Sequence, residues 1–133
     1  MNLAKEKRAK DILACVTIGT NNKEKVVAFY AELLGELGAK KLFNNENLVF
    51  FSLNMATPMI GVNTPFDGEA ATNGDGTMLP IPGGSRENVD KIYAEALALE
   101  ATDEGAPGER AAGFYGGYIS DPDRNKLTIF HMG

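Results

Sequence analysis

Two stretches of the chain repeat apolar residues at intervals of three and four, the spacing that predicts a helix with one buried face. The first stretch runs from Asn22 to Leu37 and the second from Ser85 to Leu99. Each begins at a residue whose side chain can cap a helix N-terminus. Gly38, directly after the first stretch, is a residue that commonly ends a helix. We therefore expect two helices in this chain of 133 residues.

The two helical patterns are related by a constant interval along the chain. Ser85 lies 63 positions after Asn22, and Tyr93 lies 63 positions after Tyr30. Further pairs in this register are Val16–Leu79, Ile18–Ile81, Val26–Val89, Phe29–Ile92 and Leu34–Leu97. Agreement at both caps and at several apolar positions indicates an internal duplication.

Short runs typical of β-strands flank each predicted helix. They lie at 12–18, 40–43, 48–53 and 59–62 in the first half, and at 78–82, 100–103, 114–120 and 126–130 in the second. Each half therefore follows the order β-α-β-β-β. Turn-forming residues predict an exposed link between the halves, and the segment 103–110 predicts a long loop confined to the second half. We divide the single domain, 1–133, into a tail (1–11), a first module (12–64), a linker (65–76) and a second module (77–133).

Three motifs add to the repeat: VTIGTNNKEKVVAFYAELLGELGA, GAPGER and FYGGYISDPDRNKLTIFH. Together with the repeat, they resemble the vicinal oxygen chelate superfamily of glyoxalases, bleomycin resistance proteins and extradiol dioxygenases, in particular a glyoxalase-like branch. The resemblance implies an α+β fold in which two βαβββ modules, related by pseudo-twofold symmetry, form one curved eight-stranded sheet with the helices outside. It also implies metal ligands, usually His, Glu or Gln, on the first and last strands of the modules and facing the concavity.

The positions to which the resemblance assigns metal ligands hold other residue types. They are Cys15, Met78, Thr128 and a position within 59–62 that we assign to Ile60. Divalent iron, manganese, zinc or nickel in such a site prefers imidazole and carboxylate donors. A thiol, a thioether, a hydroxyl and a hydrocarbon do not provide this set, so we expect neither a metal nor another cofactor.

Side chains alternate between the two faces of a strand, and this alternation separates a mixed face from an apolar face. Cys15 shares the mixed face of its strand with Thr17, and Thr128 shares that of the last strand with Lys126 and Phe130. Two interpretations remain open for Cys15, Met78 and Thr128: packing residues that fill a vestigial groove, or walls of a working ligand pocket.

Two further residues are candidates for that pocket. Arg110, at the end of the GAPGER motif, could clamp a carboxylate or phosphate, or it could pair with Glu109 or Glu104 at the surface. Tyr118 lies two residues after Gly116 and therefore on the same face of their strand. The missing side chain of Gly116 would leave room there for a ligand. The predicted pocket therefore contains Cys15, Ile60, Met78, Arg110, Tyr118 and Thr128, and the sequence identifies no catalytic residue.

Two local features predict departures from regular structure. Pro80 and Pro82 lack their N–H groups on the same edge of one strand, so pairing along that edge should be interrupted. Arg124 stands where the resemblance places a glycine; if that position requires a positive φ, the arginine is strained by about 1 kcal/mol.

Composition restricts the partners and the compartment. A net charge of −5 and a pI near 4.9 oppose binding to nucleic acid or to an anionic membrane. The single cysteine, Cys15, excludes an intramolecular disulfide and fits a reducing cytoplasm. His131 is the only imidazole. We expect a cytoplasmic protein, with a homodimer as a possible assembly.

The sequence thus predicts a glyoxalase/bleomycin-resistance-like protein that has lost its metal ligands and binds a small organic molecule in the sheet concavity. Whether it catalyses a reaction remains open. The alternative is a metal-dependent lyase or dioxygenase of the same superfamily whose ligands the sequence does not reveal.

Overall fold

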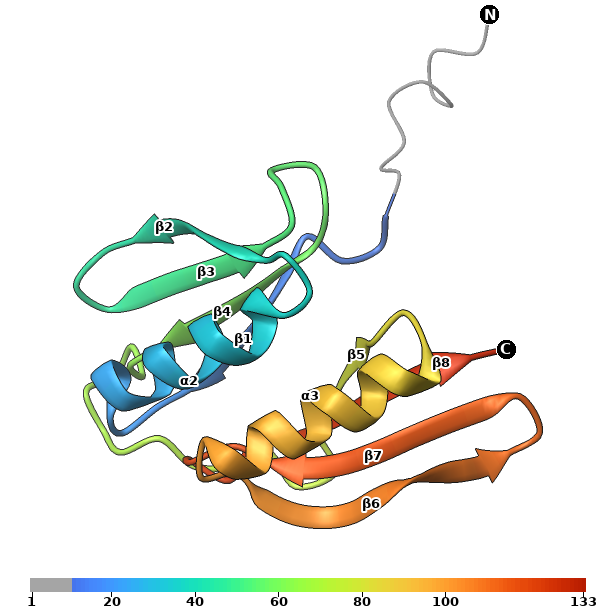
Figure 1. The fold of residues 1–133 in the computed structure, drawn as a ribbon. Helices are drawn as coiled ribbons and strands as arrows, with labels where there is room; N and C mark the ends of the chain where they lie inside the picture. Colours follow the sequence, from blue (N-terminus) through green and yellow to red (C-terminus); the bar gives the residue numbers. More distant parts are fainter. Residues whose placement is uncertain (1–10) are drawn as a thin grey trace, which may run out of the picture.

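The computed structural model describes residues 11–133, and the predicted tail lies outside this range except for residue 11. The first module contains β1 (Cys15–Gly19), α2 (Lys23–Gly35), β2 (Lys40–Asn44), β3 (Leu48–Ser52) and β4 (Met59–Asn63). The second contains β5 (Leu79–Pro82), α3 (Arg86–Ala98), β6 (Thr102–Ala111), β7 (Phe114–Ser120) and β8 (Lys126–Met132). Both modules have the order βαβββ, as Figure 1 shows, so the predicted α+β class is confirmed. The residues between β4 and β5 contain neither helix nor strand.

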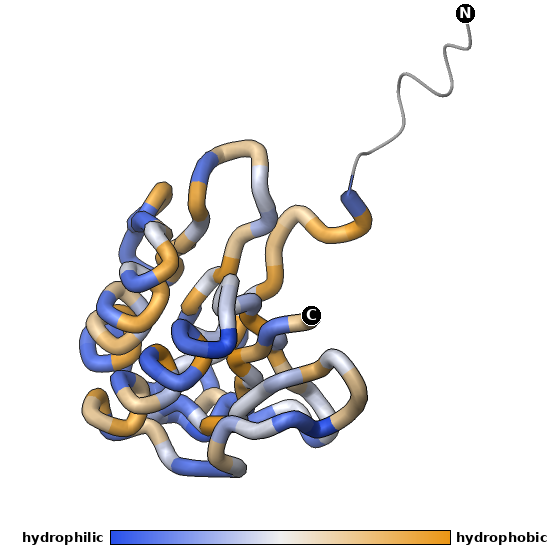
Figure 2. The backbone as a smooth tube through the Cα atoms, turned by 45° about the vertical axis from the view of Figure 1, so that its right-hand side comes forward, coloured by the Kyte–Doolittle hydropathy of each residue, from blue (hydrophilic) through white to orange (hydrophobic). Residues whose placement is uncertain are grey.

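The two helices follow the register that the sequence predicted. Each has 13 residues, and α3 begins 63 positions after α2. The side chain of Asn22 accepts a hydrogen bond from the backbone N–H of Lys25 (3.2 Å), and Ser85 accepts one from Asn88 (3.1 Å). Hydrophobic and hydrophilic residues alternate along both helices in Figure 2, as expected for helices with one buried face.

The strands form two four-stranded sheets rather than one hydrogen-bonded sheet of eight. Sheet A has the order β1-β4-β3-β2, and sheet B has the corresponding order β5-β8-β7-β6. In each sheet the first pair is parallel and the other pairs are antiparallel. Helix α2 packs on sheet A and α3 on sheet B, and the two helices contact each other (Figure 1). We call the face of each sheet that is turned away from its helix the open face.

One apolar cluster joins both modules. It includes Tyr30 and Leu33 of α2, Ile92 of α3, and Leu127 and Ile129 of β8, each at most 2% exposed. The Phe29 ring packs edge-on against the Tyr30 ring. Neither module therefore has a core of its own, because its buried helix face is shared across the module boundary.

The predicted loop at 103–110 is instead part of β6. This strand pairs antiparallel with β7, but the register shifts between Asp103 and Gly105 and again between Gly105 and Gly108. The prediction failed because glycine and proline, which usually indicate a loop, here mark bulges within a strand. Pro107 also contributes to packing, since a Cβ at Gly117 would lie 3.1 Å from its ring.

The two prolines lie on an edge strand. In the described part of the chain, β5 pairs only with β8, from Leu79 to Pro82. The backbone N–H of Gly83 donates to the carbonyl of Phe130 (2.8 Å), so the alternate N–H groups of β5 face β8 and the proline nitrogens face away. The predicted absence of pairing along the proline edge is confirmed.

A buried carboxylate joins the turn after β7 to α2. Asp121 is 2% exposed and accepts hydrogen bonds from the Tyr30 hydroxyl (2.6 Å) and from the backbone N–H groups of Asp123 and Asn125. The amide group of Asn125 donates to Asp121 and also to the carbonyl of Gly19. Burial raises the pKa of Asp121 above its usual value, although these donors oppose the rise. The turn therefore fixes the second module against the first.

Candidate functional site

The strand registers show which side chains share the open face of sheet B. Tyr118 pairs with Thr128, Gly116 with Phe130, and Thr128 with Pro80 on its other side. The neighbouring residues of β7 and β8 face α3 and form core. The alternation of side chains along the last strand therefore predicted the correct face for Thr128. The structure brings Thr128 next to Tyr118.

Arg110 joins this pair. Its guanidinium lies over the Tyr118 ring, 5.4 Å from the centroid, while Nε donates to the Gly116 carbonyl (3.3 Å) and Nη2 donates to the Ala106 carbonyl. The ammonium of Lys126 lies over the same ring at 5.3 Å. We call Arg110 and Lys126 the cation pair. Two positive groups thus share one aromatic ring.

The cation pair has no acidic partner among residues 11–133. The ion pairs of that range are Lys25–Glu100, Arg86–Glu109 and Lys91–Glu36. The alternative in which Arg110 pairs with Glu109 is therefore wrong, because Glu109 binds Arg86 at 3.1 Å. Glu104 accepts a hydrogen bond from the Ser120 hydroxyl (3.2 Å) and makes no ion pair with Arg110.

Thr128 is buried within the sheet surface. It is 1% exposed, and its hydroxyl donates to the carbonyl of Gly117 (3.0 Å). Next to it, the rings of Phe114 and Phe130 are stacked at 5.5 Å. A Cβ at Gly116 would lie 3.1 Å from the Phe114 ring and 3.3 Å from the Thr128 hydroxyl oxygen. The missing side chain of Gly116 therefore admits the Phe114 ring.

The open face of sheet A contains a separate cavity. It has a volume of about 330 Å³, and its wall includes Cys15, Phe50 and Met59. The Phe50 ring lies against Gly61, where a Cβ would be only 2.8 Å away. Cys15 is exposed, as a free thiol. Neither Met78 nor Thr128 lines this cavity.

The register corrects the position assigned to Ile60. Thr128 of β8 pairs with Pro80 of β5, and the equivalent pair in the first module is Gly61 with Thr17. Ile60 pairs with Val16 and packs against the core instead. Gly61 has no donor side chain either, so the correction does not add a metal ligand.

The remaining predicted position, Met78, immediately precedes β5 and is 37% exposed. Within residues 11–133, no three His, Cys, Asp or Glu side chains gather in an arrangement that could hold a metal ion. The structure thus brings together Arg110, Tyr118 and Thr128 on sheet B, and it places Cys15 on sheet A.

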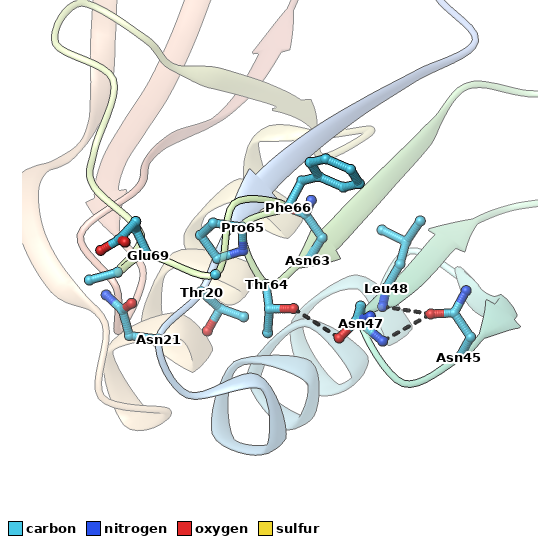
Figure 3. Close-up of a pocket in the computed structure, with 12 residues that line it drawn as sticks. Thr20, Asn21, Asn45, Asn47, Leu48, Asn63, Thr64, Pro65, Phe66 and Glu69 are labelled. Carbon is cyan, nitrogen blue, oxygen red and sulfur yellow. Dashed lines mark hydrogen bonds between the residues drawn. The ribbon is translucent and has the colours of Figure 1, made fainter.

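A third feature is a wide hollow of about 800 Å³ beside the loop that follows β4 (Figure 3). Most of its polar side chains are engaged in holding turns. Asn45 accepts hydrogen bonds from the backbone N–H groups of Asn47 and Leu48, and Asn47 accepts one from the Thr64 hydroxyl (3.2 Å). None of the residues predicted from the sequence lines this hollow.

Sequence reasoning missed Lys126, Phe114 and Phe130 as site residues. Parity along the last strand already placed Lys126 and Phe130 on the face of Thr128. What the sequence did not provide was the register between β7 and β8, which sets Tyr118 opposite Thr128.

No family sequence model and no curated protein sequence matches the chain. Among solved structures, a glyoxalase/bleomycin resistance protein from Albidiferax ferrireducens is 33% identical, with a TM-score of 0.84 over 92% of this chain and 100% of that chain. A glyoxalase/bleomycin resistance protein/dioxygenase family enzyme from Burkholderia phytofirmans is 22% identical, with a TM-score of 0.74 over 90% of this chain and 98% of that chain. A lactoylglutathione lyase from Agrobacterium tumefaciens is 18% identical, with a TM-score of 0.67 over 93% of this chain and 95% of that chain.

At 22% and 18% identity, the last two structures show similarity of fold alone. The first is similar in sequence as well, over 92% of this chain. The helix register, the two βαβββ modules and this likeness agree with the superfamily that the motifs resemble. The chain therefore belongs to the glyoxalase/bleomycin resistance protein family of the vicinal oxygen chelate superfamily.

Proposed function

We propose that this protein binds a small organic molecule on the open face of sheet B without using a metal ion. The donor set supports this proposal most directly. The ligand positions implied by the family resemblance hold Cys15, Met78, Thr128 and, after correction, Gly61. Thr128 offers only a neutral hydroxyl oxygen, where divalent iron, manganese, zinc and nickel prefer imidazole and carboxylate donors.

Surface chemistry favours the open face of sheet B as the binding surface. It offers an aromatic ring at Tyr118, the stacked rings of Phe114 and Phe130, and the cation pair. Ligand sites combine apolar and aromatic area with a few charged or polar groups that fix orientation. No helix of the described chain is both long and apolar enough to cross a membrane. The proposed partner is a small molecule, and a cytoplasmic location and a homodimer are further parts of the proposal.

Elemental analysis of protein purified without chelator tests the metal-free part. We expect less than about 0.1 equivalent of nickel, iron, manganese or zinc per chain, since the donor set is unsuited to these ions. About one equivalent of any of them would instead support the metal-dependent alternative. Binding is tested separately with the neutral fluorescent probe N-phenyl-1-naphthylamine, whose emission should rise and saturate on titration with the protein.

A further inference from the structure

The open face of sheet B carries a charge arrangement that points to a ligand class. We propose that its ligand is an organic anion with an apolar body: the acid group binds to Arg110, the charge of Lys126 at the Tyr118 ring adds to the attraction, and the body lies along Phe114 and Phe130. This inference rests on the proposed function, because it concerns the same surface.

Arg110 is held in place before any ligand binds. Of its five N–H groups, one on Nε and one on Nη2 donate to the carbonyls of Gly116 and Ala106, and three remain. Its guanidinium also stacks on the Tyr118 ring. Because the side chain is already ordered, an incoming anion encounters a smaller entropic cost than a free arginine would impose. The remaining N–H groups can make a charge-assisted pair of hydrogen bonds to one acid group.

The other face of β7 provides an internal comparison. There Arg86 lies over the Tyr115 ring at 5.0 Å, and its charge is matched by Glu109 at 3.1 Å. The cation pair repeats the Arg-over-Tyr arrangement without such a match in the described chain, although the chain as a whole carries a net charge of −5. Glu104 accepts a hydrogen bond from the Ser120 hydroxyl and forms no ion pair with Arg110 or Lys126. The charges of Arg110 and Lys126 therefore favour an anionic ligand.

The surface beyond the cation pair is apolar. Phe114 lies four residues from Tyr118 along β7, a span of about 13 Å at the usual rise of an antiparallel strand. Between them, Gly116 has no side chain, and the Thr128 hydroxyl is already donated to the Gly117 carbonyl. A ligand that extends from the cation pair toward Phe114 thus meets no free polar side chain on β7. This favours an organic acid with an aromatic or aliphatic body over inorganic phosphate.

Two related dyes test the proposal. 8-Anilino-1-naphthalenesulfonate and neutral N-phenyl-1-naphthylamine share a ring system, and only the first is an anion. In fluorescence titrations, Arg110→Met combined with Lys126→Met should raise the Kd of the sulfonate by about tenfold or more, because the charge-assisted contact with Arg110 and the attraction of Lys126 are both lost. The Kd of the neutral dye should change by less than about twofold. 4-Phenylbutyrate should displace the sulfonate, and equal concentrations of inorganic phosphate should not.

Arg86→Met is the matched control, since it removes an arginine stacked on a tyrosine from the opposite face. It should leave the Kd of the sulfonate unchanged, whereas Phe130→Ala should weaken both dyes. Circular dichroism confirms that each variant is folded. If the double variant leaves sulfonate binding unaltered, or if Arg86→Met weakens it equally, the inference is wrong while neutral-dye binding still supports the proposed function. If neither dye binds the wild type, the proposed function fails as well.

Discussion

Arg124 has a backbone conformation that glycine adopts without steric cost. Its φ is 70°, in the turn between β7 and β8, and its N–H donates to the carbonyl of Asp121 (2.8 Å). The resemblance to the family placed a glycine here, and the structure keeps the positive φ instead of changing the turn. The hydrogen bonds that Asp121 makes therefore hold Arg124 in a strained conformation.

Replacing this arginine by glycine should stabilise the protein. Relief of the left-handed strain gains about 1–2 kcal/mol, and the greater freedom of glycine in the unfolded chain removes about 0.4–1 kcal/mol. For Arg124→Gly we expect a net increase of about 0.5–1 kcal/mol in the free energy of unfolding, measured by urea denaturation. Arg124→Ala keeps the strain and should show no such gain. Equal stability of the two variants would show that φ is not the cause.

The helices are the elements that the sequence determines most clearly, and their N-caps are local enough to test singly. The hydroxyl oxygen of Ser85 accepts a hydrogen bond from the backbone N–H of Asn88 at the start of α3. Alanine has no acceptor at this position. Ser85→Ala should lower the free energy of unfolding by about 1 kcal/mol and the Tm by about 3–6 °C. Ser85→Asp retains an acceptor beside the positive end of the helix and should stay within about 0.5 kcal/mol of wild type. A loss of equal size in both variants would mean that the cap does not act through this bond.

The strands were less predictable than the helices, for physical reasons. Residues 114–120 were predicted with their correct bounds because aromatic and β-branched residues are typical of strands. The strand at 102–111 was predicted only at its beginning, since its Gly and Pro residues are equally typical of loops. Ile60 was misassigned because parallel pairing with β1 depends on contacts distant in sequence. The alternation of side chains along a strand is a local property, and it placed Thr128 correctly. The carbonyls that bind Arg110 belong instead to a bulged hairpin, which no local sequence pattern predicts.

At the scale of the whole molecule, one buried hydrogen bond connects the modules. The Tyr30 hydroxyl of α2 donates to Asp121, which follows β7, at 2.6 Å, and both residues are at most 2% exposed. With a single apolar cluster across the boundary, this bond should make the chain unfold as one cooperative unit. The open faces of the two sheets are therefore positioned relative to each other by the same contacts that stabilise the core.

Tyr30→Phe should lower the free energy of unfolding by about 1–3 kcal/mol near pH 7, because Asp121 loses a donor in a buried site. The alkaline limb of the stability profile should change too. Burial, followed by the negative charge of Asp121, holds the pKa of Tyr30 well above its ordinary value of 10.0. The unfolded chain therefore ionises at a pH where the folded chain does not. The stability that Tyr30 contributes is complete below pH 10 and declines above it, by about 1.4 kcal/mol per pH unit.

Urea denaturation between pH 7 and pH 11 separates this contribution from that of the other tyrosines. Tyr93→Phe is the matched control, because the Tyr93 hydroxyl also donates to an aspartate at 2.6 Å, but at an exposed site. Its hydrogen bond to Asp103 raises the pKa of Tyr93 as well, yet solvent screens an exposed pair, so its removal should change stability and the alkaline decline less than Tyr30→Phe does. An unchanged alkaline slope in Tyr30→Phe would show that this hydroxyl already ionises in the folded protein, and the bond to Asp121 would then not be the link between the modules.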